Sequence, residues 1–249
     1  MNILIYGIGG AMGKTVYNCL REEKQAIPCC GVDKYLLENP YDIPVYKNCL
    51  EVDKKIDCII DFSSHNAVYD YIPYAVKNKI PAVVATTGFN EEEQALIDEA
   101  SKTIPIFQSG NMSLGVNILM QLVKKTARAI GDIADIEIVE THHNQKADSP
   151  SGTAIMLANT VKEELPSTEF IYGREGIVGK RPKKEVGIHA VRGGSVVGKH
   201  EISFFMNNEI IKLSHEAESK TIFARGSIKA ALFLVKQPCG KYDMNDLLI

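Results

Sequence analysis

Short apolar runs alternate with stretches of helical pattern along residues 1–110. Apolar runs without internal alternation are typical of strands covered on both faces by the helices that connect them. The pattern therefore predicts an α/β domain built on a doubly wound parallel sheet. The expected strands cover residues 2–6, 27–33, 57–62, 81–86 and 104–108, and the expected helices cover residues 11–21, 66–79 and 91–102, the last with Asn90 as its N-cap.

The pattern changes near residue 111, where we expect a domain boundary. Residues 113–130 carry the apolar stripe of a long helix, and residues 151–165 form another helical stretch. Residues 133–141 alternate with a period of two, which places Glu140 on the same side as the apolar Ile136 and Ile138. Residues 186–217 are strand-like, with an expected hairpin turn at Asn207–Asn208. A run of strands after a helix predicts a separate α+β domain with a mixed or antiparallel sheet.

A glycine-rich segment, GIGGAMG, occupies residues 7–13 between the first strand and the first helix. Gly7 and Gly9 fit the dinucleotide-binding pattern GxGxxG, but the third glycine falls one residue late, at Gly13. Glycines here let backbone N–H groups approach a pyrophosphate, and the helix N-terminus adds a favourable dipole. Asp33, at the end of the next strand, is suited to accept the ribose hydroxyls. The segment predicts a dinucleotide site; the alternative is a purely structural Gly-rich turn.

A second polar segment, ETHHNQKADSPSGT, spans residues 140–153. It joins the end of a strand to the start of a helix, which is a natural site for an anion such as a carboxylate. His142 and Lys146 are candidate general acids beside it. The alternative is a solvated loop without a site. No third ligand stands at metal-binding spacing, and we expect structural roles for the other histidines, His65, His189, His200 and His215.

Charge and composition exclude other classes of function. The formal net charge is −3, with no basic face predicted, so we expect no nucleic-acid partner. No apolar run approaches the roughly 18 residues that cross a bilayer, and the N-terminus does not resemble a signal peptide. The six cysteines include no CxxC pair and are expected to be reduced, buried thiols. We therefore expect a cytoplasmic protein.

The motifs together resemble the 4-hydroxy-tetrahydrodipicolinate reductase family, also called the dihydrodipicolinate reductase family, of bacterial diaminopimelate and lysine biosynthesis. The resemblance covers nearly the whole chain. Its most specific string is HH-x-x-K-x-D-x-P-S-G-T-A at residues 142–154. The other matching motifs are GIGGAMG at 7–13, DFS at 61–63, ATTGF at 85–89, NMSLGVN at 111–117 and GKYDMNDLL at 240–248.

The resemblance implies a Rossmann-type domain made of residues 1–111 and 219–249. Residues 112–218 are then a substrate-binding and tetramerisation domain with a mixed sheet, and the enzyme is a homotetramer. The implied reaction is reduction of a cyclic small-molecule substrate to tetrahydrodipicolinate with NADH or NADPH.

The family's functional residues carry over to matching positions. The implied proton donors are His142 and Lys146, and the implied substrate-carboxylate ligands are His143, Gly152 and Thr153. The implied cofactor contacts are Gly7, Ile8, Gly9, Gly10, Ala11, Met12, Asp33, Lys34, Ala85, Thr86, Thr87, Ser109, Gly110, Asn111 and Met112. Many members carry Arg at the position of Ala11, where it meets the 2′-phosphate of NADPH, so its absence puts an NADPH preference in doubt, although Lys34 could partly compensate.

Two other functions share part of this pattern. A different reductase on the same scaffold would keep the glycine segment but lack the second motif. A nucleotide-sensing regulator would bind the cofactor without a proton donor, and the pair His142 and Lys146 argues against it.

Overall fold

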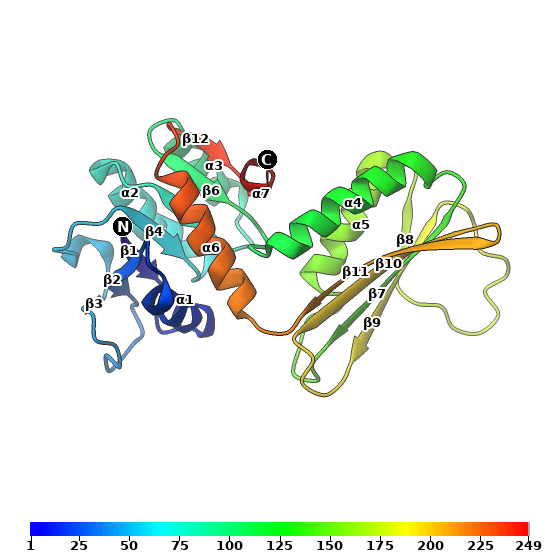
Figure 1. Cartoon of the computed structure of the whole chain (residues 1–249), viewed down its shortest axis with the longest axis horizontal. Coiled ribbons are helices and arrows are strands. Elements are labelled where there is room, and N and C mark those ends of the chain that lie inside the picture. Colours follow the sequence, from blue (N-terminus) through cyan, green and yellow to red (C-terminus); the bar gives the residue numbers. More distant parts are fainter. Residues whose placement is uncertain (249) are drawn as a thin grey trace. The chain divides into compact units, whose positions relative to one another are not determined.

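The computed structural model describes residues 1–248, which divide into two compact units. Unit 1 comprises Met1–Leu114 and Lys220–Ile249, and unit 2 comprises Gly115–Ser219. Unit 1 is therefore made of two separate stretches of chain, and unit 2 is one continuous stretch between them (Figure 1).

Unit 1 contains a seven-stranded sheet in the order β12-β6-β5-β4-β1-β2-β3, and every neighbouring pair is parallel. Six of these strands follow the 3-2-1-4-5-6 order of dinucleotide-binding folds, so the α/β doubly wound prediction is confirmed. The strand order reverses between β1 and β4, where ligands of such sheets bind beyond the carboxyl ends of the strands. The strands are β1 (Asn2–Tyr6), β2 (Ile27–Val32), β3 (Val45–Tyr46), β4 (Cys58–Asp61), β5 (Ala82–Val84), β6 (Pro105–Gln108) and β12 (Gly240–Tyr242).

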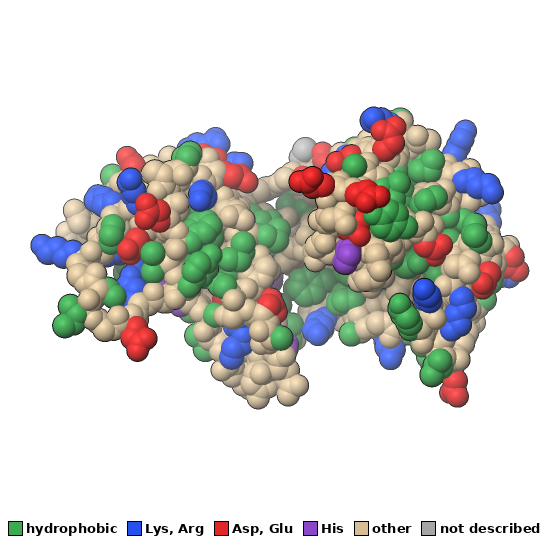
Figure 2. Space-filling model, turned by 180° about the vertical axis from the view of Figure 1, so that it is seen from behind, with side chains coloured by type: hydrophobic (Ala, Val, Ile, Leu, Met, Phe, Trp, Pro, Cys, Tyr) green, Lys and Arg blue, Asp and Glu red, His purple; other side chains and the backbone are tan. Residues whose placement is uncertain are grey.

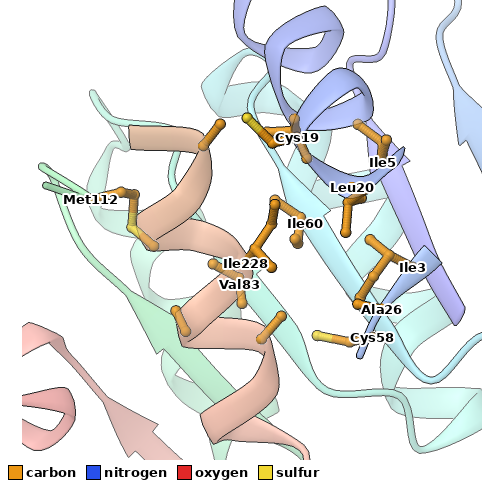
Figure 3. Close-up of a cluster of buried hydrophobic side chains, with 14 of the residues drawn as sticks. Ile3, Ile5, Cys19, Leu20, Ala26, Cys58, Ile60, Val83, Met112 and Ile228 are labelled. Atoms are coloured by element: carbon orange, nitrogen blue, oxygen red, sulfur yellow. The ribbon is translucent and has the colours of Figure 1, made fainter. Parts of the chain in front are cut away.

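Two hydrophobic cores cover the two faces of this sheet. Helices α1 (Ala11–Glu22) and α6 (Thr221–Leu234) contribute to one core, and α2 (Val68–Asn78) and α3 (Glu91–Ser101) to the other. Figure 3 shows Ile228 of α6 beside Val83 and Ile60 of the sheet in the first core. Asn90 caps α3 in a reciprocal capping box, as the sequence predicts. The remaining elements are the short helices η1 (Cys49–Glu51), η2 (His65–Ala67) and α7 (Met244–Leu247).

Unit 2 contains a five-stranded sheet in the order β11-β10-β7-β9-β8. Strand β9 is parallel to β7 and β8, whereas β10 is antiparallel to β7 and β11, which confirms the mixed sheet. Helices α4 (Leu114–Ile130) and α5 (Gly152–Glu164) pack on one face, where their apolar side chains join Ile136, Ile138 and Ile188 in a third core. The strands are β7 (Asp135–His142), β8 (Glu169–Ile171), β9 (Glu185–Arg192), β10 (Gly198–Met206) and β11 (Glu209–Ala217).

The structure corrects some details of the sequence-based expectation. The six cysteines are free, but Cys29 is half-buried and Cys239 is exposed, so the expectation of burial is wrong for these two. The turn at Asn207–Asn208 joins β10 to β11 as expected, with Asn208 in the left-handed region at φ 65°. Within residues 1–248, no helix is both long enough and apolar enough to cross a membrane. Hydrophobic side chains at the surface are interspersed with acidic and basic ones (Figure 2).

Candidate active site

The glycine loop of unit 1 follows β1 directly and leads into α1. Gly7 has a φ of 80°, a left-handed conformation that favours glycine, and its carbonyl accepts the Gly10 N–H at 3.1 Å. Helix α1 begins at Ala11, and its N-cap, Gly10, makes no side-chain hydrogen bond within residues 1–248. Ala11 is exposed and Met12 packs against the core, whereas the buried Ile8 accepts the Tyr41 hydroxyl through its carbonyl at 2.7 Å.

Close packing around this loop explains its glycines. A Cβ at position 13 would stand 2.2 Å from the carbonyl oxygen of Gly7, and a Cβ at position 7 would stand 2.6 Å from that of Phe62. Both distances are much shorter than a van der Waals contact. The turn and the helix can therefore lie this close together only if positions 7 and 13 are glycine. The resulting cradle of bare backbone at a helix N-terminus fits a pyrophosphate.

Asp33 lies just beyond β2 and connects two loops. Its Oδ2 accepts the Gly9 N–H at 2.9 Å, and its Oδ1 accepts the N–H groups of Tyr35 and Leu36 at 2.9 and 3.1 Å. The carboxylate is thus held beside the glycine loop, where an acidic residue meets a ribose in this fold. Lys34 is exposed, with Nζ 5.9 Å from the Tyr35 ring centroid.

A buried carboxylate, Asp61, organises the loops after β4 and β5. It is fully buried and bonded to the side chains of Ser63, Thr86 and Tyr71, and its carbonyl accepts the Ala85 N–H. Burial raises the pKa of Asp61 to about 6, although these hydrogen bonds oppose the shift. Thr86 Oγ1 in turn accepts the Ser63 N–H at 2.9 Å. These hydrogen bonds hold the loop after β5, which the resemblance assigns to the nicotinamide, against the loop after β4. Thr87 is exposed at the tip of the loop after β5.

The segment after β6 lies at the same end of the sheet, beyond the carboxyl ends of the strands. Ser109 Oγ donates to the Asn111 carbonyl at 2.9 Å, and Asn111 Oδ1 accepts the Ser113 N–H at 2.9 Å. Met112 is buried in the core beside α6 (Figure 3), whereas Gly110 is exposed. These turns follow the carboxyl ends of β4, β5 and β6 and lie at the edge of the sheet that carries the glycine loop.

His142, the candidate acid of unit 2, is the last residue of β7 and its side chain is 10% exposed. Its Nδ1 lies 2.6 Å from Oε2 of Glu140, two residues earlier on the same side of the strand. Glu140 is fully buried. A buried carboxylate needs partners, because an isolated buried charge is strongly disfavoured.

Arg192 and Ser151 supply those partners. Arg192 Nη1 and Nη2 donate to the two oxygens of Glu140 at 2.8 Å each, and the Ser151 N–H donates to Oε1 at 2.9 Å. Burial alone would raise the pKa of Glu140, but the hydrogen bonds from Arg192, His142 and Ser151 outweigh it and lower the pKa. Glu140 is therefore held as an anion.

His200 of β10 completes the buried cluster. Its ring lies edge-on to His142 with centroids 5.1 Å apart, and its Nε2 lies 2.9 Å from Ser151 Oγ. Burial, together with the neighbouring His142, lowers the pKa of His200 to about 4, so this imidazole is neutral near pH 7. His200 therefore packs against His142 and contacts the N-cap of α5.

The loop after β7 holds the two other polar residues of the motif. The His143 N–H donates to the Val196 carbonyl at 2.7 Å, and the buried His143 Nδ1 has no hydrogen-bond partner among residues 1–248. Lys146 Nζ pairs with both oxygens of Asp148 at 2.8 and 2.9 Å. Lys146 is therefore positioned by Asp148, whose pKa it lowers.

The loop ends at the N-terminus of α5, where Ser151 is the N-cap and accepts the Ala154 N–H. Gly152 is exposed, and a Cβ there would meet nothing within 4 Å. Thr153 is half-buried in the first helical turn. Open space over a helix N-terminus suits a carboxylate. Within residues 1–248, no group of three or more His, Cys, Asp or Glu side chains could hold a metal ion.

The sequence-based prediction brought together His142, His143, Lys146 and the start of α5, but it missed Glu140, Arg192 and His200. A signal for Glu140 was present, because a charged residue on the apolar side of an alternating strand needs a partner. Arg192 and His200 lie 50 or more residues beyond His142 in the chain, and only the pairing of β9 and β10 with β7 brings them close.

Comparison with solved structures identifies the general class. A probable dehydrogenase from Thermotoga maritima has a TM-score of 0.60 at 15% identity, covering 99% of this chain and 92% of that one. A dipicolinate-bound dihydrodipicolinate reductase from Paenisporosarcina sp. TG-14 has a TM-score of 0.80 at 22% identity, covering 98% of both chains. With its glycine loop and strand order, the chain has the fold of the Rossmann-type dehydrogenases and reductases.

The family follows from sequence. Residues 1–112 match the family described as dihydrodipicolinate reductase, N-terminus, and residues 115–248 match dihydrodipicolinate reductase, C-terminus. The chain is 47% identical to the 4-hydroxy-tetrahydrodipicolinate reductase of Caldanaerobacter subterraneus subsp. tengcongensis, over 100% of this chain and 98% of that one. It is 43% identical to that of Clostridium tetani, over 100% and 97%. The chain therefore belongs to the dihydrodipicolinate reductase family, which confirms the resemblance, and it is an oxidoreductase of the kind that uses a nicotinamide cofactor.

Proposed function

We propose that this enzyme reduces 4-hydroxy-tetrahydrodipicolinate to tetrahydrodipicolinate in diaminopimelate and lysine biosynthesis. The carrying observation is His142, an imidazole hydrogen-bonded to a buried carboxylate at the end of β7; the same carboxylate accepts the Ser151 N–H at the start of α5, and Lys146 lies in the loop between them. Membership of the family indicates which substrate is reduced, and the arrangement of these residues places an acid next to an anion site.

The cofactor, NADH or NADPH, is proposed to bind unit 1. The bare backbone of the glycine loop fits the pyrophosphate, Asp33 and Lys34 face the adenosine ribose, and the loops after β5 and β6 hold the nicotinamide. Their residues are those that the resemblance implies: Gly7, Ile8, Gly9, Gly10, Ala11, Met12, Ala85, Thr86, Thr87, Ser109, Gly110, Asn111 and Met112. When bound, the nicotinamide supplies a hydride.

The substrate is proposed to bind unit 2. It carries carboxylates, and the N–H groups of Gly152 and Thr153 at the start of α5 are suited to hold one of them. His143, with its unpartnered Nδ1, and the Lys146 ammonium add hydrogen bonds and positive charge.

The proton step is assigned to His142. Reduction adds a hydride and a proton and releases the substrate hydroxyl as water, so an acid must stand close to the ring. His142 Nε2 is the nitrogen left to donate that proton, because Nδ1 is bonded to Glu140. Lys146 stabilises negative charge or donates a second proton.

The assembly is proposed to be a cytoplasmic homotetramer that forms through the sheet of unit 2. Helices α4 and α5 cover only one face of this sheet. Val139, Val191 and Phe205 alternate onto the other face, where they are 39%, 47% and 38% exposed. Apolar side chains on an uncovered sheet face favour association with another copy.

One assay tests the proposal. Purified enzyme is mixed with freshly generated 4-hydroxy-tetrahydrodipicolinate and NADH or NADPH, and absorbance is followed at 340 nm. Oxidation of the cofactor that depends on substrate, with tetrahydrodipicolinate as product, supports the proposal. Cofactor binding without turnover would favour the nucleotide-sensing alternative, and turnover only with other imines would favour a different reductase.

A further inference from the structure

We infer that Glu140 is a positioning residue that fixes His142 in one tautomer and one orientation, with Nδ1–H on the carboxylate and Nε2 toward substrate. The inference rests on the proposed function, because it concerns how the proposed acid is prepared. It stands on the 2.6 Å distance between His142 Nδ1 and Glu140 Oε2 and on the complete burial of Glu140.

Glu140 has no freedom to rotate away from His142. Its Oε1 accepts the Ser151 N–H and Arg192 Nη2, and its Oε2 accepts Arg192 Nη1 and faces His142. A planar guanidinium that engages both oxygens also fixes the plane of the carboxylate. Strands β7 and β9 and the start of α5 are thereby joined at one carboxylate.

The same contacts determine which atom is the donor and which the acceptor in the hydrogen bond between Glu140 and His142. Glu140 stays ionised, so it can only accept, and His142 Nδ1 must carry the proton. In the neutral ring, Nε2 is then unprotonated, and in the charged ring the second proton is on Nε2. The charged ring is the form that donates, and it donates from Nε2.

The surroundings of His142 Nε2 favour access by a substrate. Within residues 1–248, none of the hydrogen bonds of the structure engages this atom. Gly198, the first residue of β10, borders it: a Cβ at position 198 would stand 3.0 Å from Nε2. A side chain at 198 would therefore crowd the atom that meets substrate.

The other groups around His142 do not replace Glu140. His200 of β10 is neutral near pH 7 and bonds to Ser151, Lys146 pairs with Asp148, and Arg192 of β9 is committed to Glu140. Arg192 Nη2 also donates to the Asp148 carbonyl at 2.9 Å, so one guanidinium holds both Glu140 and the loop that carries Lys146.

Glu140→Gln is the test, and Glu137→Gln is its matched control. Glu137 lies on the same strand and also bonds two arginines and a histidine, with His189 Nε2 at 2.8 Å, but away from the motif. A glutamine at 140 presents an amide NH₂ to His142 or to Arg192 and removes the charge. We expect kcat to fall at least tenfold in Glu140→Gln, with the Kd of the cofactor unchanged, and kcat of Glu137→Gln to stay within twofold of wild type at unchanged assembly.

Two readouts separate positioning from general stability. In Glu140→Gln, the pH profile of kcat should differ from that of wild type, because position 140 no longer places a negative charge beside His142. The ¹⁵N shifts of His142 in wild-type enzyme should show a protonated Nδ1 and an unprotonated Nε2 in the neutral ring. The NMR measurement needs no variant, so it remains decisive if Glu140→Gln fails to fold.

The inference is overturned if Glu140→Gln keeps more than half of wild-type kcat with an unchanged pH profile, or if neutral His142 carries its proton on Nε2. Failure of the proposed function has a different signature. Wild-type enzyme would then not turn over the substrate, or His142→Gln would retain its kcat, while the tautomer of His142 would still report on Glu140.

Discussion

Gly226 of α6 and Met112 approach each other so closely that a Cβ at position 226 would stand 1.7 Å from the Met112 carbonyl oxygen. This contact joins α6 to the segment that follows β6, and both belong to unit 1. A carbonyl of the main chain cannot rotate aside as a side chain does. The α6 backbone must therefore move if any side chain is present at 226.

Gly226→Ala is expected to lower the free energy of unfolding by about 1–3 kcal/mol, the usual cost of overpacking, or more if α6 undocks. Urea unfolding followed by circular dichroism measures this. Gly152→Ala is the control, because a Cβ there meets nothing within 4 Å, and it should change stability little. Equal stability of the two variants would contradict the tight contact at Gly226.

We predict that the enzyme uses both cofactors, with NADH at least as good as NADPH. Asp33 beside the glycine loop repels a 2′-phosphate but hydrogen-bonds a free 2′-hydroxyl, and Ala11 supplies no positive charge in compensation. The check is kcat/KM for both cofactors. A preference for NADPH above about tenfold, or roughly 1.4 kcal/mol, would show the assignment of Asp33 to be wrong.

Thr153→Val and Gly152→Val are expected to raise the KM for substrate while the Kd for the cofactor stays constant. Both changes lie at the start of α5, and a side chain at 152 would fill the open space over the helix N-terminus. Steady-state kinetics give the KM for substrate, and titration of the cofactor followed by fluorescence gives its Kd. Weaker cofactor binding at constant KM for substrate would contradict a carboxylate site there.

His142→Gln and Lys146→Ala are each expected to lower kcat by roughly 10²–10⁴-fold, the usual contribution of a positioned acid. Both variants should still bind NADH, because the proposed cofactor site lies in unit 1. The double variant should lose less than the product of the single losses, since residues that act as a unit are not additive. His142 is not the acid if His142→Gln keeps more than about a tenth of wild-type kcat, a loss of less than roughly 1.4 kcal/mol.

Asp61 should make stability depend on pH in a direction opposite to that of an ordinary ion-paired carboxylate. Burial raises its pKa from 3.8 to about 6, so the folded state binds its proton more tightly than the unfolded state does. The stability contributed by the protonated form is present below pH 4 and is lost as pH rises to about 6.

Comparing wild type with Asp61→Asn isolates this effect from other titrating groups. Between pH 4 and 6 the stability of wild type should fall relative to the variant by about 3 kcal/mol, because a tenfold change in proton affinity corresponds to roughly 1.4 kcal/mol. Above that range the difference should be constant. Parallel stability curves from pH 4 to 8 would show that Asp61 is not a buried, perturbed carboxylate.

Local patterns in the sequence predicted β1, β2, β4, β5 and β6 of unit 1, the long helix α4 and the alternation of β7, because each is encoded within a few neighbouring residues. The short strands β3, β8 and β12 were not found, since two or three residues carry no measurable periodicity. The pair Glu140 and Arg192 was also missed. The contact between these two residues depends on the register of β7 and β9, which places His142 opposite Arg192. The sequence of either strand alone does not predict that register.

Unit 2 is one continuous stretch of chain inserted between β6 and α6, and this has a consequence for biosynthesis of the enzyme. Residues 115–219 can form their core as soon as they leave the ribosome, before the second stretch of unit 1 has been made. Until then the sheet of unit 1 lacks α6 on one face, and β6 is paired with β5 but lacks its other partner, β12. Unit 1 is therefore begun before unit 2 but completed after it, and during translation its apolar surface stays uncovered until residues 220–248 have been made.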